Sequence, residues 1–214
     1  MVQILEQDNY QVALDLAKQQ LASLDPETQA RRCGCGLEHP GVERHIEVPY
    51  TDLVCRISIP DGNVTIAGSD DPLSMWEQIL VLHYIGSTGD APEEEEDPIA
   101  FSQVPSGAFY DSAFQQRVKN HFLSVFAKNP GLLKPAAEKL GGVPFKGGDT
   151  GVRIPAFPRV GLYFSLWKAD EEFPADMSLL LSSNIASFLS TEDIAVLGGL
   201  VAGKLIKHAK KIEV

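Results

Sequence analysis

The order in which strand-like and helix-like segments follow one another limits the fold of this chain most. Apolar side chains alternate with others over 152–156 and again over 160–166, as they do in β-strands. A third apolar run, 177–181, follows them. Because strands and helices come in separate runs and not in strict alternation, we expect an α+β fold. Its sheet should be largely antiparallel or mixed and packed with several helices.

A long amphipathic helix is predicted at the C-terminal end of the sequence. Ser190 supplies an N-cap hydroxyl and Asp193 stands at the third helical position, close to a capping-box arrangement. Three glycines inside the helix weaken it by about 1 kcal/mol each relative to alanine. We therefore expect them to allow close backbone packing against the sheet or a second subunit. The apolar stripe is Ile194, Leu197, Val201 and Leu205, and the glycines are Gly198, Gly199 and Gly203.

The N-terminal part of the sequence predicts a helix followed by a small β region. The helical pattern ends at Asp25-Pro26, and a loop rich in glycine and cysteine covers 31–41. Pro60-Asp61-Gly62-Asn63 has the composition of a tight turn, so the strands on either side of it should form a hairpin. The predicted strands are 46–48, 54–59 and 64–66.

Three more helices and an acidic loop are predicted before the main strands. Asp71 before Pro72 indicates the start of a helix that runs to about Ile85. Six carboxylates within 89–98 repel one another, which is typical of an exposed loop. The other two helices are predicted over 111–128 and 132–140. We expect one domain over 1–214, in which an N-terminal helix and small β subregion, 1–68, pack on 69–214.

The charge and the cysteine content narrow the class of protein. A formal net charge of −11 disfavours sequence-independent binding to nucleic acid or to anionic lipid, since both need clustered Lys and Arg. The helical apolar run 194–203 is much shorter than the roughly 20 residues that a bilayer requires, so we predict no membrane partner. Three cysteines form an odd set that suits a reducing compartment. We expect a cytoplasmic protein.

Four short strings together resemble one known family. They are Ile79-Leu80-Val81-Leu82-His83-Tyr84, Gly107-Ala108-Phe109-Tyr110, Leu166-Trp167-Lys168-Ala169-Asp170-Glu171-Glu172-Phe173-Pro174 and Ser190-Thr191-Glu192-Asp193. The chain resembles the domain of unknown function (DUF) 3786 family over most of its length. That resemblance implies an origin in strictly anaerobic bacteria or archaea and a setting near iron-sulfur modules, but no established activity. The sequence departs from the family pattern at Ser182-Ser183, where Phe-Asp is expected, and at Cys33-Gly34-Cys35.

An acidic group at a strand end is the first candidate site. Asp170 and Glu172 follow the predicted strand, and alternate residues of a strand face the same side. Carboxylates in this position can act as acid or base or bind a cationic ligand when apolar walls shift their pKa values. The alternative is an ordinary acidic, exposed turn with Trp167 and Phe173 packed over its base. Arg153 and Tyr110 are further candidates for the rim of such a pocket, and Trp167 and His83 are further ligand-binding candidates. Buried Tyr and His nevertheless more often only satisfy hydrogen bonds.

A metal site is the second candidate. Cys33, Cys35 and His39 offer two thiolates and an imidazole within seven positions, and these are ligands for zinc or iron. Closed zinc sites usually need four ligands from paired clusters, and no second pair exists here, so we predict no bound metal. Three cysteines are also too few for an iron-sulfur cluster held by this chain alone. The sequence identifies no cofactor.

Three functions remain open at this stage. The first is a non-enzymatic binding or accessory module that interacts with a redox or iron-sulfur protein and can form homo-oligomers. The second is a small-molecule-binding protein or enzyme with an acidic pocket around Asp170 and Glu172. The third is metal binding through Cys33 and Cys35. The first is preferred because no complete catalytic constellation is found in the sequence.

Overall fold

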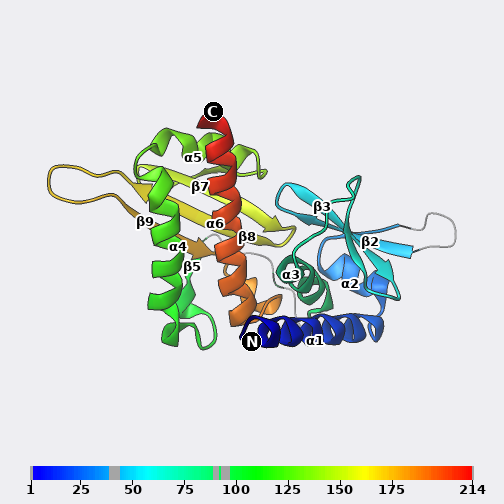
Figure 1. Ribbon diagram of the computed structural model, residues 1–214. Helices are drawn as coiled ribbons and strands as arrows, with labels where there is room; N and C mark the ends of the chain where they lie inside the picture. The colour runs from blue at the N-terminus through cyan, green and yellow to red at the C-terminus, as the bar shows by residue number, and fades with distance from the viewer. Residues whose placement is uncertain (1, 39–43, 89–91, 93–96, 214) are drawn as a thin grey trace. The chain divides into compact units, whose positions relative to one another are not determined.

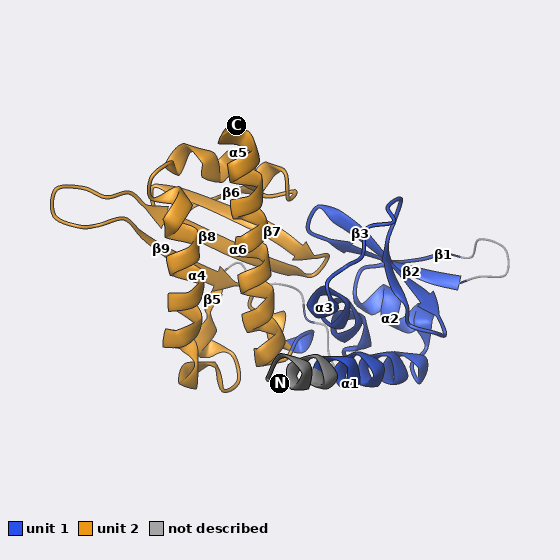
Figure 2. Ribbon diagram, in the orientation of Figure 1, with its two compact units in different colours: residues 1–92, 187–189 blue, residues 93–186, 190–214 orange. Residues whose placement is uncertain are grey.

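The computed structural model describes residues 2–38, 44–88, 92 and 97–213. Its elements group into two compact units, coloured separately in Figure 2. Unit 1 comprises residues 1–92 and 187–189, and unit 2 comprises residues 93–186 and 190–214. Each contains α-helices and one antiparallel sheet, so the predicted α+β class is confirmed. The single domain over 1–214 stays a prediction, and unit 1 extends beyond the expected subregion 1–68.

Unit 1 contains a four-stranded antiparallel sheet and three helices within its described residues (Figure 1). The strands lie in the order β1-β2-β3-β4. Helices α1 and α3 pack together, and the Tyr10 and Trp76 rings lie 4.0 Å apart, centroid to centroid. The elements are α1 (Val2–Ala22), α2 (Pro26–Arg32), β1 (Gly36–Glu38), β2 (Arg44–Tyr50), β3 (Leu53–Ile59), β4 (Val64–Ile66) and α3 (Met75–Gly86).

The sheet of unit 1 is built from strands in which buried side chains alternate with more exposed ones. Ile46, Val48 and Tyr50 of β2 are buried, while the residues between them are more exposed. The predicted hairpin is confirmed, since β3 pairs with β4 across the turn. Gly62 in that turn has φ +68°, a conformation that side chains with a Cβ rarely adopt.

Two helix starts in unit 1 differ from the prediction. Helix α3 begins at Met75 and not after Asp71, because Ser74 forms a full capping box with Glu77. Helix α2 was not predicted, although Asp25 accepts a hydrogen bond from the Thr28 N–H at 2.8 Å and Pro26 occupies the first helical turn. A helix of seven residues is too short for its apolar period to stand out.

Unit 2 contains a five-stranded antiparallel sheet in the order β5-β9-β8-β7-β6. Its strands are β5 (Ile99–Ala100), β6 (Val143–Phe145), β7 (Thr150–Phe157), β8 (Val160–Trp167) and β9 (Asp176–Leu181). Its helices are α4 (Asp111–Phe126), α5 (Leu133–Glu138) and α6 (Thr191–Glu213), with 3₁₀ turns η1 (Phe101–Gln103), η2 (Gly107–Phe109) and η3 (Pro130–Leu132). A further turn, η4 (Ile185–Ser187), precedes α6. The predicted strands over 152–181 are all confirmed.

Helices α4 and α6 run side by side over the sheet of unit 2 (Figure 1). Phe122 of α4 stacks on Phe164 of β8 with 5.7 Å between ring centroids. A Cβ on Gly198 would stand 2.8 Å from the Phe114 ring and 3.2 Å from Leu179, so the predicted close packing is confirmed there. A Cβ on Gly199 or on Gly203 would have no described atom within 4 Å, so the predicted close packing against the sheet is not found at these two glycines.

The predicted start of the long C-terminal helix is also confirmed. The Ser190 hydroxyl accepts a hydrogen bond from the Asp193 N–H, and the Asp193 carboxylate accepts one from the Ser190 N–H, both at 3.2 Å. These bonds satisfy two backbone donors near the helix start. Across the described residues, no helix combines the length and the apolar character needed to cross a membrane.

Candidate functional site

The loop 168–175 between β8 and β9 carries the acidic group predicted from the sequence. The Asp170 carboxylate accepts hydrogen bonds from the N–H groups of Phe173, at 2.7 Å, and Glu172, at 2.9 Å. The Asp170 N–H in turn donates to the Phe173 carbonyl at 3.0 Å. The bond from Phe173 and then that from Glu172 lower the pKa of Asp170. Asp170 therefore orders the turn in its ionised form, through the two hydrogen bonds that its carboxylate accepts.

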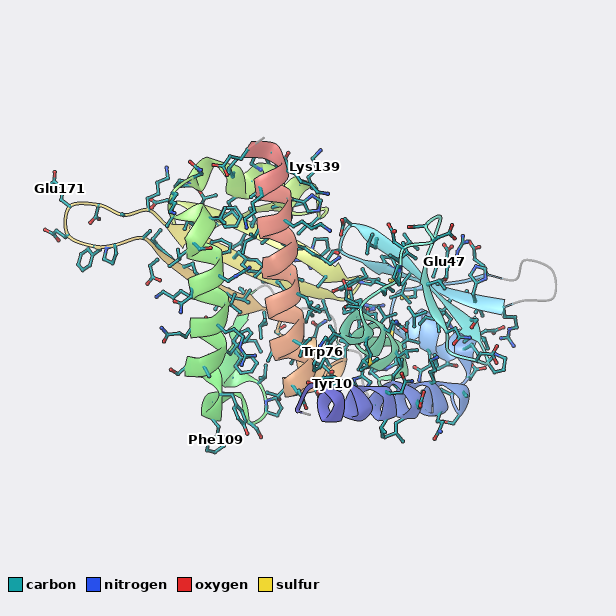
Figure 3. The ribbon with its side chains drawn as sticks, viewed as in Figure 1. Tyr10, Glu47, Trp76, Phe109, Lys139 and Glu171 are labelled. Carbon is teal, nitrogen blue, oxygen red and sulfur yellow. The ribbon has the colours of Figure 1, made fainter. Side chains whose placement is uncertain are left out.

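The base of the same loop is fixed by a second carboxylate. Asp149 accepts a hydrogen bond from the Lys168 N–H at 2.8 Å, and its own N–H donates to the Leu166 carbonyl at 2.8 Å. The expectation that Trp167 and Phe173 pack over the base of this turn is wrong, since Trp167 at the end of β8 is 42% exposed and Phe173 in the loop is 66% exposed. Glu171 lies at the far tip of the hairpin (Figure 3). We call residues 167–174 the hairpin tip. It combines ordered backbone with exposed aromatic and acidic side chains.

Arg153 is held by the neighbouring strand. Its Nε donates a hydrogen bond to the Tyr163 hydroxyl at 3.1 Å, and its guanidinium carbon lies 5.6 Å from the centre of that ring. A Cβ on Gly161 would lie within 2.9 Å of the guanidinium group, so glycine leaves the space that Arg153 occupies across β8. Both contacts with Tyr163 hold the Arg153 side chain against strand β8 of unit 2.

Tyr110 lies in a different part of unit 2, where it lines a pocket of about 520 Å³. The pocket is lined by residues of η1, the two residues that flank η2, the first two turns of α4 and the start of α6, and its apolar lining includes Phe101 and Phe114. Of the ligand-binding candidates predicted from the sequence, only Tyr110 is among the described residues that line this pocket. The structure thus brings Asp170 and Glu172 together in one loop and places Arg153 and Tyr110 at two other positions.

The two charged residues that line this pocket were not identified from the sequence. They are Arg117 on α4 and Glu192 on α6. They are 75 positions apart in the sequence, and each belongs to a polar face that any amphipathic helix has. No local pattern could have joined them.

The cysteine pair is part of the interior of unit 1. Cys33 is fully buried and its thiol donates a hydrogen bond to the Tyr84 carbonyl at 3.3 Å, while the Tyr84 hydroxyl donates to the Cys33 carbonyl at 2.7 Å. The Cys35 thiol donates to the Cys33 carbonyl at 3.6 Å. Burial, and then the neighbouring Cys33, raise the pKa of Cys35 far above its ordinary value. His39 lies outside the described residues, and His83 is half-buried on α3.

A group of potential metal ligands that the sequence analysis missed lies on the sheet of unit 1. Oxygen and nitrogen atoms of Glu38, His45 and Glu47 lie within 4.8 Å of one another. His45 Nε2 is 3.5 Å from the Glu38 carboxylate, and Arg56 forms an ion pair with Glu47 at 2.8 Å. The antiparallel pairing of β1 with β2 sets Glu38 opposite His45. This register cannot be read from the sequence alone, so the sequence analysis did not find the group. The Glu38–His45 contact and the Glu47–Arg56 ion pair therefore lie on neighbouring strands β1, β2 and β3.

Comparison with protein families gives one result. The family model described as a domain of unknown function (DUF3786) matches residues 25–204. It therefore covers elements of both units, from α2 to most of α6. Comparisons with curated proteins and with solved structures found no match.

Proposed function

Because the chain belongs to the DUF3786 family, whose description assigns no reaction, we propose a function from the geometry of its own surface. We propose that the protein is a non-enzymatic accessory module that binds a partner protein through its hairpin tip. The partner is a redox or iron-sulfur protein of an anaerobe's cytoplasm, and the surface that it presents to the hairpin tip is basic. One observation carries this proposal, namely an ordered hairpin that exposes aromatic side chains.

The order of the hairpin tip supports binding because it lowers the entropy cost of association. A flexible loop must lose conformational freedom when a partner binds, whereas the loop fixed by Asp170 and Asp149 has lost much of it already. Exposed aromatic side chains are the residues that most often dominate the free energy of protein association. Phe173, at 66% exposure, gains burial only in a complex.

The charge of the hairpin tip supports a basic partner. Asp170, Glu171 and Glu172 are all exposed, and Lys168 is the one cation among residues 167–174. The whole chain also carries a formal net charge of −11, which attracts a cationic surface over a longer range and speeds the encounter. The placement of the four predicted pocket residues favours this function over an acidic catalytic pocket. Tyr110 lines a separate pocket, and Arg153 is hydrogen-bonded to Tyr163 on β8.

The proposal is tested by anaerobic co-purification from the native host with quantitative mass spectrometry. The tagged wild-type chain is compared with Phe173→Ser and with the double charge reversal Glu171→Lys, Glu172→Lys. We expect one metalloprotein to be recovered with the wild type, and its recovery to fall about tenfold or more in both variants. Recovery should also decrease between low and high salt, because surface charges are screened.

Two matched variants serve as controls. Val143→Ser removes an exposed apolar side chain on β6, and Glu138→Lys reverses an exposed charge on α5. Both should leave the recovered partner unchanged. Equal recovery with the hairpin variants and the controls would exclude the hairpin tip as the binding surface. Recovery of no metalloprotein under any condition would remove the accessory role itself.

A further inference from the structure

The pocket lined by Tyr110 is a partly open hollow of unit 2, and none of its lining residues belongs to the hairpin tip. Its walls come from two distant parts of the chain, residues 101–117 and 191–195. Its volume of about 520 Å³ falls inside the range of about 300 to 1,000 Å³ typical of small-molecule sites. The side chains of Phe114, Ala113 and Ala195 give it a mainly apolar lining. A ligand with an apolar body would fit this interior.

Several interactions hold the walls of the pocket in place. The Thr191 hydroxyl donates to the Pro105 carbonyl at 2.5 Å and so joins the start of α6 to the η1–η2 segment. Phe101 and Phe114 stack with 4.2 Å between ring centroids. A Cβ on Gly107 would lie 2.0 Å from the Phe101 carbonyl oxygen, so only glycine allows this chain path. The site is therefore formed before any ligand arrives, which favours binding.

The backbone of the pocket also contains an uncommon conformation. Ser106, which lines the pocket, has φ +60° and ψ 2°, a left-handed conformation that residues other than glycine seldom adopt. Strained residues of this kind are concentrated at ligand sites, where the surrounding structure holds them. The hydroxyl of Ser106 adds a hydrogen-bonding group to the pocket lining.

The charge of the pocket indicates the class of ligand. Arg117 is exposed, and within the described part of the chain its side chain makes no hydrogen bond or ion pair. A guanidinium group binds a carboxylate through two parallel hydrogen bonds. Glu192 has a separate structural role, because an acidic side chain in the first turn of α6 stabilises the positive end of the helix dipole. Arg117 stands in the middle of α4 and has no such role.

We propose that this pocket binds an organic carboxylate with an aromatic or aliphatic body. The apolar body lies against Phe114, Ala113 and Ala195, and the carboxylate pairs with Arg117. This binding activity does not depend on the hairpin tip. A protein that carries both would bind a partner and a small acid at separate surfaces of unit 2.

The test uses the full-length chain labelled with ¹⁵N and three probes of one shape, 3-phenylpropionate, 3-phenylpropan-1-ol and 3-phenylpropylamine. Backbone amide shifts of Ala113 and Ala195 are followed by NMR during each titration. We expect saturable shifts with the acid and an affinity at least about tenfold higher than that of the alcohol, as a charge-assisted pair provides. Arg117→Met should reduce the affinity for the acid to that for the alcohol. Lys128→Met removes an exposed charge outside this pocket and should leave the affinities for the acid and for the alcohol unchanged.

A second variant tests the position of the apolar body. Ala113→Phe adds a ring at an exposed position of α4 that lines the pocket, so it should block the probe while the chain stays folded. Phe173→Ser in the hairpin tip should leave acid binding unchanged, which separates this proposal from the accessory function. Absence of saturable shifts at Ala113 and Ala195 would overturn the site. Equal or tighter binding of the amine, or unaltered acid binding in Arg117→Met, would overturn the ligand class.

Discussion

The Asp170 carboxylate accepts a hydrogen bond from the backbone N–H of Phe173 with 2.7 Å between Oδ1 and N. The most exposed aromatic side chain of the hairpin tip is thereby placed by the acidic residue three positions before it. The acidic string first considered as a catalytic candidate thus contains one carboxylate that shapes the loop. The neighbouring Glu171 and Glu172 are left to supply exposed charge.

Acid should therefore disorder the hairpin tip. Hydrogen bonds to its ionised form lower the pKa of Asp170 from the ordinary 3.8, so this contribution to loop order is complete above that value. It is lost as the pH falls through the lowered pKa. We expect the amide protons of Glu172 and Phe173 to shift upfield in that acidic range in an NMR titration. In Asp170→Asn, which keeps an acceptor oxygen but has no charge, the transition should disappear. A persisting transition would assign it to another group.

The capping box of α6 predicts a measurable loss of stability. In Ser190→Ala, the Asp193 N–H loses its hydroxyl acceptor at 3.2 Å, and the Asp193 carboxylate loses the hydroxyl that donates to it at 2.7 Å. We expect the free energy of unfolding to fall by about 1 kcal/mol in urea denaturation. Ser112→Ala, an exposed serine on α4, should change it by less than about 0.5 kcal/mol. Equal effects of the two substitutions would contradict the role of the cap.

The features that the sequence predicted well are those that neighbouring residues determine. The strands over 152–166 show alternation, and the strand over 177–181 is an apolar run. The turn at Gly62 has its characteristic residues, and the start of α6 depends on Ser190 and Asp193. The start of α3 was placed too early because two competing caps, Asp71 and Ser74, stand three residues apart. The reciprocal bonds between Ser74 and Glu77 decided between them.

The parts that could not be predicted depend on contacts between distant residues. The grouping of residues 187–189 with unit 1 follows from Phe188, whose ring lies 5.4 Å from that of Tyr84 and 5.3 Å from the Arg32 guanidinium carbon. Arg117 and Glu192 line the same pocket although they are distant in the sequence, and Glu38 lies opposite His45 because of the register between β1 and β2. The sequence analysis allowed for an exposed acidic turn at Asp170, but not for the hydrogen bonds by which the Asp170 carboxylate orders it. The acidic group as a ligand site stays a prediction.

The cysteine pair should be chemically inert in the folded chain. Burial raises the pKa of Cys35, so its thiol stays protonated at neutral pH, and Cys33 has no exposed surface. We expect reaction with Ellman's reagent at pH 8 to be at least about tenfold slower in the native chain than in guanidinium chloride. Elemental analysis after anaerobic purification should give far less than one metal per chain. Stoichiometric zinc or iron that is lost in Cys33→Ser would instead establish the metal site.

Two adjacent glycines of α6 provide the last prediction, because they differ in surroundings and share a helix. A methyl group at Gly198 would stand 2.8 Å from the Phe114 ring, which is itself buried between α4 and the sheet, whereas Gly199 has open space. Gly199→Ala should raise the free energy of unfolding by up to about 1 kcal/mol, because alanine favours the helix. In Gly198→Ala the same gain is opposed by overpacking of about 1 to 3 kcal/mol. Urea denaturation should therefore rank Gly199→Ala above the wild type and Gly198→Ala below Gly199→Ala. If both variants gain equally, α4 is free to move away from α6, and the fixed pocket wall formed by Phe114 is lost as an explanation for ligand binding.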